Sequence, residues 1–241
     1  MCDGSEKYNR LLVYYKKMFA QVDYFHFNSS VTRDVYERCI EVPKGEVVTI
    51  THLGVHDNRE IKEFDSKSLR LGFIGNTTSY KGFPLLKQIL LSFSDAGLTG
   101  WLLSVYGSEV KIDADNLNIE FRGKFTSEDL KRVYSEMDLL IVPSVCYETF
   151  SLITLEALSF GVPVLVSATV GARDIVERYA PDFIFNTPDE LKQMLASLVA
   201  DRKRLIDYNR KIIESPWLYM PGKHLDDIDR LYRDALGGKL K

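Results

Sequence analysis

The sequence predicts an α/β protein in which a parallel sheet is covered by helices on both faces. From residue 69 onward, short and nearly continuous apolar segments alternate with longer segments of helical spacing. Strands that are buried on both faces have such continuous apolar runs, which is typical of parallel sheets. Polar, glycine-containing loops follow several of these segments, as expected at the ligand-binding edge of a Rossmann-like sheet.

Each expected strand is rich in β-branched or aromatic residues and is flanked by turn-forming residues. The strands cover residues 69–74, 101–106, 119–121, 138–142, 162–166 and 183–185. Helices are expected at 82–96, 126–136, 150–160, from 187 onward, and at about 201–214 and 223–236. Two helix starts carry explicit signals. Asp129 follows Thr126 as in a capping box, and Thr187 precedes proline at the first helical position and Glu190 at the third.

The first 68 residues predict a smaller α/β unit. It has helical spacing over 6–21 and 31–40, and short strands at 24–27 and 47–50. Residues 56–68 are charged and lack periodicity, which predicts a linker. The expected domains are therefore residues 1–68, as the tail of another domain with its linker, and residues 69–241 as the main domain.

Composition excludes several classes of protein. A hydrophobic content of 45% allows a substantial core, and 31 basic against 34 acidic residues give no footprint for nucleic acid. The three cysteines are widely spaced and the four histidines lack metal-ligand spacing, so no metal site is predicted and a cytoplasmic location is expected. No apolar run approaches the ~20 residues of a membrane span. The aromatic-rich start predicts packing within the protein or, at most, peripheral contact with the inner membrane surface.

The most informative motif is a pair of carboxylates, Glu148 and Glu156, between the strands at 138–142 and 162–166. An ionised carboxylate only accepts hydrogen bonds, so it suits a sugar diol that offers two donors. The alternatives are a helix-surface charge for Glu156 and a charge favoured by the helix dipole for Glu148. Because Glu156 lies in a helix that is apolar nearly all round, its charge requires a partner.

A second candidate is the loop after strand 69–74, which contains Gly75, Asn76 and Lys81. Small residues let backbone N–H groups approach a phosphate, and a lysine adds positive charge. The pattern matches neither a Walker loop nor the dinucleotide fingerprint, and an ordinary turn is the alternative.

Three further positions follow other strands and are candidates for ligand contact. Gly171 would permit close backbone approach, while Gly107 and Lys124 could cradle a base or diphosphate. The alternatives are a plain connection and solvated surface charges.

Together these motifs resemble the carboxy-terminal, donor-binding half of a GT-B retaining glycosyltransferase of family 4. The resemblance covers about residues 22–235. It rests on Pro143-Ser144, on Glu148 through Glu156, on Gly161-Val162-Pro163-Val164, on Lys81-Gly82 and on Val170-Gly171-Ala172-Arg173-Asp174, with residues 51–55 similar to the interdomain crossing.

The resemblance implies a role for each matched position. Glu148 would lie near the donor sugar, Glu156 would hold the ribose, and Lys81 would neutralise the departing diphosphate. The amides of Phe150, Ser151 and Leu152 would bind phosphate. The donor would be a nucleotide-diphosphate sugar, used as substrate, and no metal cofactor is expected.

Two departures from the family pattern affect the expectation. Asn76 stands where the family usually has arginine, and only 68 residues precede the donor domain. The chain is therefore expected to be a truncated enzyme that needs an acceptor domain or a partner chain. A non-catalytic interaction module and a sugar-nucleotide epimerase of related architecture remain as alternatives.

Overall fold

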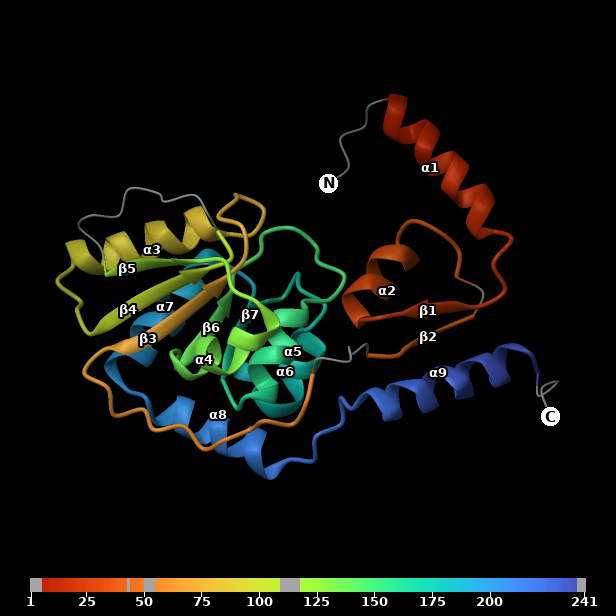
Figure 1. The fold of residues 1–241 in the computed structure, drawn as a ribbon. Helices are drawn as coiled ribbons and strands as arrows, with labels where there is room; N and C mark the ends of the chain where they lie inside the picture. Colours follow the sequence, from red (N-terminus) through yellow and green to blue (C-terminus); the bar gives the residue numbers. More distant parts are fainter. Residues whose placement is uncertain (1–5, 43, 50–54, 109–117, 238–241) are drawn as a thin grey trace.

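The computed structural model describes residues 6–42, 44–49, 55–108 and 118–237 (Figure 1). The larger unit is built on a six-stranded sheet whose neighbouring strands are all parallel. Its strands are β3 (Leu69–Ile74), β4 (Trp101–Tyr106), β5 (Ile119–Gly123), β6 (Leu139–Val142), β7 (Val164–Ser167) and β8 (Ile184–Phe185).

The strand order is β5-β4-β3-β6-β7-β8, which is the Rossmann order. The predicted fold class is therefore confirmed. From β3 the chain continues to β4 and from β6 to β7, in opposite directions across the sheet, so the connections after these two neighbouring strands lead to opposite faces of the sheet. This switch point is where open α/β sheets bind ligands.

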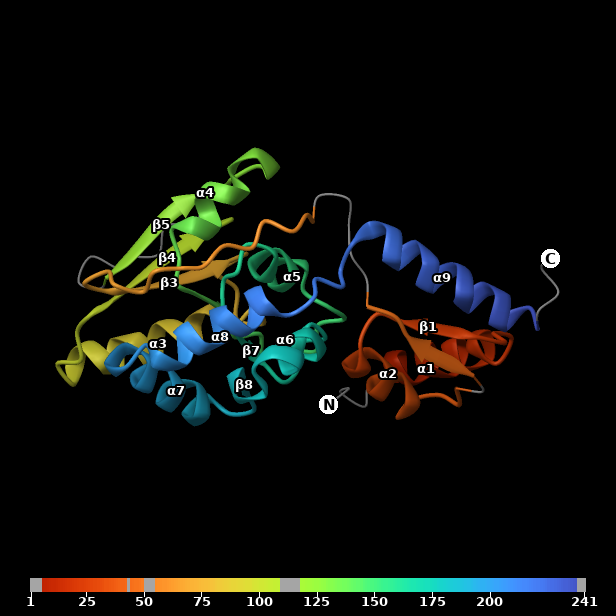
Figure 2. The same cartoon turned by 90° about the horizontal axis from the view of Figure 1, so that it is seen from below.

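Helices cover both faces of the sheet: α3 (Phe83–Asp95) and α7 (Pro188–Ala200) lie on one, and α4 (Leu130–Ser135) and α5 (Leu152–Ser159) on the other (Figure 2). Helices α6 (Arg173–Tyr179) and α8 (Lys203–Glu214) complete this unit. All four residues of β6 and all four of β7 are buried, as the continuous apolar runs predicted.

Several predicted boundaries differ from the structure. The helix expected over 126–136 is a short 3-10 turn, η1 (Ser127–Asp129), followed by α4, although the capping box of Thr126 and Asp129 is present. The helix expected from residue 150 begins at Leu152, because Ser151 has φ 140° and ψ 92°, outside the helical region. A second short turn, η2 (Pro181–Phe183), precedes β8.

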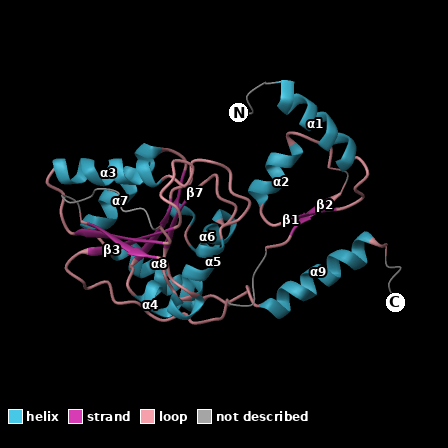
Figure 3. Ribbon diagram, turned by 45° about the horizontal axis from the view of Figure 1, so that its top comes forward, coloured by secondary structure: helices cyan, strands magenta, loops and turns pink. Residues whose placement is uncertain are grey.

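The smaller unit contains α1 (Glu6–Phe19), β1 (Phe25–Phe27), α2 (Ser30–Glu37) and β2 (Gly45–Val47) (Figure 3). Strands β1 and β2 pair in parallel, and β2 begins two residues before the strand expected at 47–50. The rings of Phe19, Phe25, Phe27 and Tyr36 pack on one another between the sheet and the helices.

The last helix, α9 (Pro221–Ala235), leaves the larger unit and lies along the smaller one (Figures 1 and 2). Arg230 donates to Glu46 at 2.6 Å, and His224 Nδ1 lies 3.2 Å from the carbonyl of Thr49. The C-terminal helix thus packs on the smaller unit at the other end of the chain.

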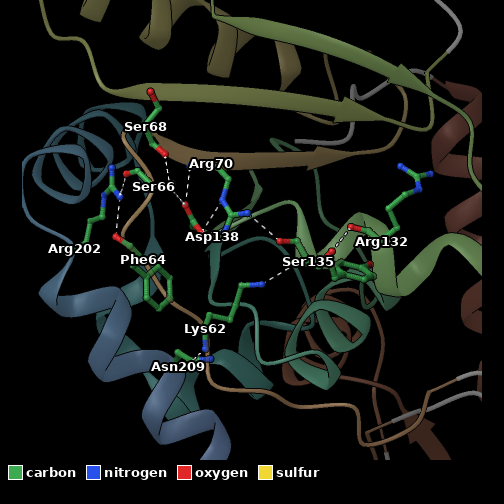
Figure 4. Close-up of polar contacts among 11 residues, drawn as sticks. Lys62, Phe64, Ser66, Ser68, Arg70, Arg132, Ser135, Asp138, Arg202 and Asn209 are labelled. Atoms are coloured by element: carbon green, nitrogen blue, oxygen red, sulfur yellow. Dashed lines mark hydrogen bonds and ion pairs between the residues drawn. The ribbon is translucent and has the colours of Figure 1, made fainter.

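Residues 56–68, the predicted linker, have no regular structure but are held on the larger unit as a strap (Figure 4). Arg202 donates to the carbonyl of Phe64 at 2.8 Å, and the Asn209 side chain accepts from Lys62 N at 3.1 Å. Next to the strap, Asp138 is fully buried and accepts from the Arg70 backbone N–H at 2.9 Å and from its guanidinium at 2.6 Å. These contacts fix the start of β3 against the start of β6.

Lys62 gives this strap a pH-dependent effect on stability. Burial, with the positive charge of Arg70 nearby, lowers the pKa of Lys62 from 10.5 to about 8. The unfolded state binds more protons between these values, so the free energy of unfolding rises as the pH increases through this window. We expect Lys62→Met to remove that rise in urea unfolding measured from pH 8 to 10.5.

Lys67→Met is the matched control, because Lys67 is an exposed lysine of the same strap. Its stability curve should run parallel to that of the wild type. A Lys62→Met curve that also ran parallel would show that Lys62 titrates in the same way in both states.

Candidate functional site

The loops that follow β3 and β6 meet at the switch point. The backbone N–H of Val145 donates to the carbonyl of Tyr80 at 3.0 Å, which joins the two loops directly. Between them lies a pocket of about 280 Å³, lined by Gly75, Lys81, Ser144, Glu148, Ser151 and Leu152 among others. Five of these six residues were predicted from the sequence as site residues.

An ion pair crosses this pocket. Lys81 Nζ lies 3.0 Å from Glu148 Oε2, and the two side chains are 37% and 14% exposed. Ser144, which is buried, donates its hydroxyl to the other oxygen, Glu148 Oε1. The carboxylate is therefore fixed on one side by a lysine and on the other by a hydroxyl, and both partners come from the loops that form the pocket.

Helix α5 begins at the edge of the same pocket. The first N–H groups of a helix have no acceptor within it, so a helix start favours an anion. Ser151 is the only residue other than glycine that has a positive φ in the part of the chain that the structure describes. Phe150 is buried, and its carbonyl accepts from the N–H of Ala172 at 3.2 Å.

The turns at Gly75 and Gly107, both predicted as site residues, lie side by side at the sheet edge. A side chain at Gly107, which has φ 82°, would come within 3.3 Å of Gly75 N. Gly75 N already donates to the carbonyl of Tyr106 at 2.9 Å, so this particular amide is used by the fold. Asn76 and Lys124 lie on the surface near these turns.

Gly171 makes a close approach, but to polypeptide. A Cβ atom there would overlap the carbonyl of Thr149 and the hydroxyl of Ser29, and Gly171 N donates to the carbonyl of Glu148 at 2.9 Å. Ser29 itself donates to the Thr149 carbonyl at 2.7 Å. The start of α2 in the smaller unit is thus docked directly on the loop that carries Glu148.

Glu156 lies one turn beyond Ile153, a residue that lines the pocket, but is not itself part of the lining. Its side chain is half-buried, and Glu156 Oε2 accepts from the hydroxyl of Tyr134 at 2.8 Å. The sequence required a partner for this charge and did not identify it. Tyr134 and Ser144 are the residues that sequence reasoning missed as supports for the two carboxylates, because neither has a spacing that points to its partner.

No cluster of three or more His, Cys, Asp or Glu side chains that could hold a metal occurs in the described parts of the chain. Within the same residues, every helix is too short or too polar to cross a lipid bilayer.

Comparison with known proteins identifies the family. Residues 68–201 match the family described as glycosyl transferases, group 1. The chain belongs to this family. The match covers all strands of the larger sheet and all of the loops around the pocket.

Individual relatives support the same fold. The sulfoquinovosyl transferase of Arabidopsis thaliana is 26% identical over 135 residues, which are 54% of this chain and 26% of that protein. The structure of a sucrose-phosphate synthase from Thermosynechococcus elongatus superposes with a TM-score of 0.69 at 18% identity, covering 98% of this chain and 65% of that one. The HepE protein of Anabaena, solved with UDP and glucose, has a TM-score of 0.69 at 13% identity and covers 95% of this chain and 68% of that one. The two solved structures have the GT-B fold, and this chain spans only part of the length of its relatives.

The backbone of Ser151 leads to a prediction about stability. A residue with a side chain at φ 140° is strained by about 1–3 kcal/mol, and glycine tolerates a positive φ better because it lacks a Cβ atom. We expect the relief of this strain to exceed the cost of greater flexibility in the unfolded chain and of the lost 3.2 Å hydrogen bond from Thr154 to Ser151 Oγ, so Ser151→Gly should raise the free energy of unfolding by at most about 1 kcal/mol.

The control is Ser94→Gly within helix α3, where the same change should lower the free energy of unfolding by about 0.5–1 kcal/mol. Chemical denaturation of the two variants beside the wild type measures both effects. Equal losses of stability in the two variants would mean that Ser151 is not strained.

Proposed function

We propose that this chain is the donor-binding part of a retaining glycosyltransferase that takes a nucleotide-diphosphate sugar. The observation that carries the proposal is the Lys81–Glu148 pair in the switch-point pocket, beside the start of α5. Within this one pocket, the cation and the helix start suit the negative diphosphate. The fixed carboxylate suits the sugar at the other end of the ligand. Family membership supports the same reaction class.

The charges suit the departure of a diphosphate. As the bond between the sugar and the diphosphate breaks, negative charge grows on the leaving oxygen and positive charge on the anomeric carbon. In this proposal Lys81 and the amides at residues 150–152 stabilise the former, and Glu148 stabilises the latter. Lys81 is paired with Glu148 at 3.0 Å, so a bound diphosphate would add a second anion to a lysine that is already oriented.

The nucleoside would extend from this pocket toward α4 and α5. Glu156 would accept hydrogen bonds from the ribose hydroxyls, and the turns at Gly107 and Lys124 would border the base. No step of the proposal uses a metal cofactor. Asn76 offers no positive charge beside the diphosphate, so in this proposal the positive charge comes from Lys81.

The acceptor side of the enzyme would come from further polypeptide. In the described part of the smaller unit the only sheet is the two-stranded β1–β2 pair, and an isolated two-stranded sheet is marginal in water. Helix α1 also exposes Leu11, Val13, Tyr14, Tyr15 and Met18. We propose that an acceptor domain or a partner chain covers these surfaces, and that the enzyme works in the cytoplasm with at most peripheral contact with a membrane.

A non-catalytic interaction module is the second candidate, and Asn76 is the observation that favours it. Such a module would keep the fold and the docked smaller unit without binding a donor. The two candidates differ in one measurable property, which is the affinity for nucleoside diphosphates.

We expect the chain to bind a nucleotide sugar and its nucleoside diphosphate in titration calorimetry with a panel of donors. Lys81→Ala should weaken diphosphate binding about 10- to 100-fold, because a hydrogen bond to a charged group contributes roughly 1.5–3 kcal/mol. Lys131→Ala is the control, since Lys131 is a lysine on the exposed surface of α4.

Absence of heat with every donor and every nucleoside diphosphate would favour the interaction module. Binding that Lys81→Ala leaves unchanged would place the diphosphate elsewhere on the chain.

A further inference from the structure

Tyr134 is a partner that contacts the Glu156 carboxylate from a neighbouring helix. Its side chain on α4 is fully buried, and its hydroxyl donates to Glu156 Oε2 at 2.8 Å and lies 3.4 Å from the carbonyl of Ile153. Glu156 is therefore tied to a neighbouring helix.

Tyr134 is itself fixed at two other points. Its ring stacks on Phe160, with ring centres 5.3 Å apart and an angle of 18° between the planes. Its carbonyl accepts from Lys62 Nζ at 3.0 Å, so the strap secures the backbone at the same residue. Because its ring is stacked and its backbone is hydrogen-bonded, Tyr134 already holds its hydroxyl at one position. The tyrosine therefore loses little conformational freedom when a ligand binds.

The chemistry of the pair fixes the direction of the hydrogen bond. Burial and the adjacent Glu156 carboxylate hold the pKa of Tyr134 well above its usual range, so the hydroxyl keeps its proton. An ionised carboxylate accepts only, with about four lone-pair sites on its two oxygens. The bond to Tyr134 occupies one of these sites and orients the carboxylate plane.

We propose that Tyr134 is a positioning residue that sets Glu156 to receive the ribose diol of the donor nucleotide. This inference rests on the proposed donor binding and adds a determinant of ribose recognition. Without the tyrosine hydroxyl, the carboxylate would lose this anchor, and part of the cost of ordering it would fall on each binding event.

The test compares ribose with a sugar that lacks the diol. Calorimetry would measure the affinities of uridine, adenosine and guanosine diphosphates and of their 2′,3′-dideoxy counterparts for the full chain. In the wild type we expect the best of the three to bind at least about 100-fold more tightly than its dideoxy form, because two hydrogen bonds to a charged group are lost. Tyr134→Phe keeps the stacked ring and should reduce this ratio about 3- to 10-fold, through weaker binding of the ribonucleotide alone.

Glu156→Gln is the matched variant, because it changes the acceptor of the same hydrogen bond. It should reduce the ratio of ribonucleotide to dideoxynucleotide affinity at least as much as Tyr134→Phe does. The double variant should lose no more than Glu156→Gln alone, because the tyrosine acts through the glutamate. The test remains valid if Tyr134→Phe is less stable than the wild type. The affinity for the dideoxy nucleotide reports the folded fraction of each variant, so a loss of folded protein weakens both ligands equally.

Different failures have different meanings. If no nucleoside diphosphate binds the wild type, the proposed donor binding itself is overturned. If nucleotides bind but Tyr134→Phe keeps the full preference for ribose, or weakens both ligands equally, Tyr134 has only a structural role and the inference is wrong.

Discussion

The site depends on the pairing of β3 with β6 at the centre of the sheet. Leu71 faces Leu139 in this parallel register, so the loops that leave the two strands are held side by side. Lys81 and Glu148, 67 residues apart in sequence, can form their 3.0 Å ion pair only because these loops start from neighbouring strands. The ion pair between Arg70 and the buried Asp138 secures the opposite end of the same two strands.

The two carboxylates of the candidate site share a form of support. Each accepts from a buried hydroxyl, which comes from Ser144 of the same loop for Glu148 and from Tyr134 of a neighbouring helix for Glu156. Both donors fix the orientation of an acidic side chain without neutralising its charge. The smaller unit adds another constraint, because Ser29 binds the carbonyl of Thr149, directly beside Glu148.

The sequence predicted the elements whose determinants are local. Strand β6 was recognisable as a continuous apolar run, and the cap of α7 was visible in Thr187 and Glu190, which form the expected hydrogen bond. The start of α5 was placed too early because a serine gives no sign of a positive φ. The contacts that hold the carboxylates were not predictable, since Tyr134 and Glu156 meet only when α4 packs beside α5.

The most direct test of the central claim is a crystal structure of the chain soaked with a nucleoside diphosphate. The account predicts the terminal phosphate within hydrogen-bonding distance of Lys81 Nζ and of the first amides of α5, with the ribose directed toward Glu156. A nucleotide bound elsewhere, with the Lys81–Glu148 pocket filled only by water, would contradict it.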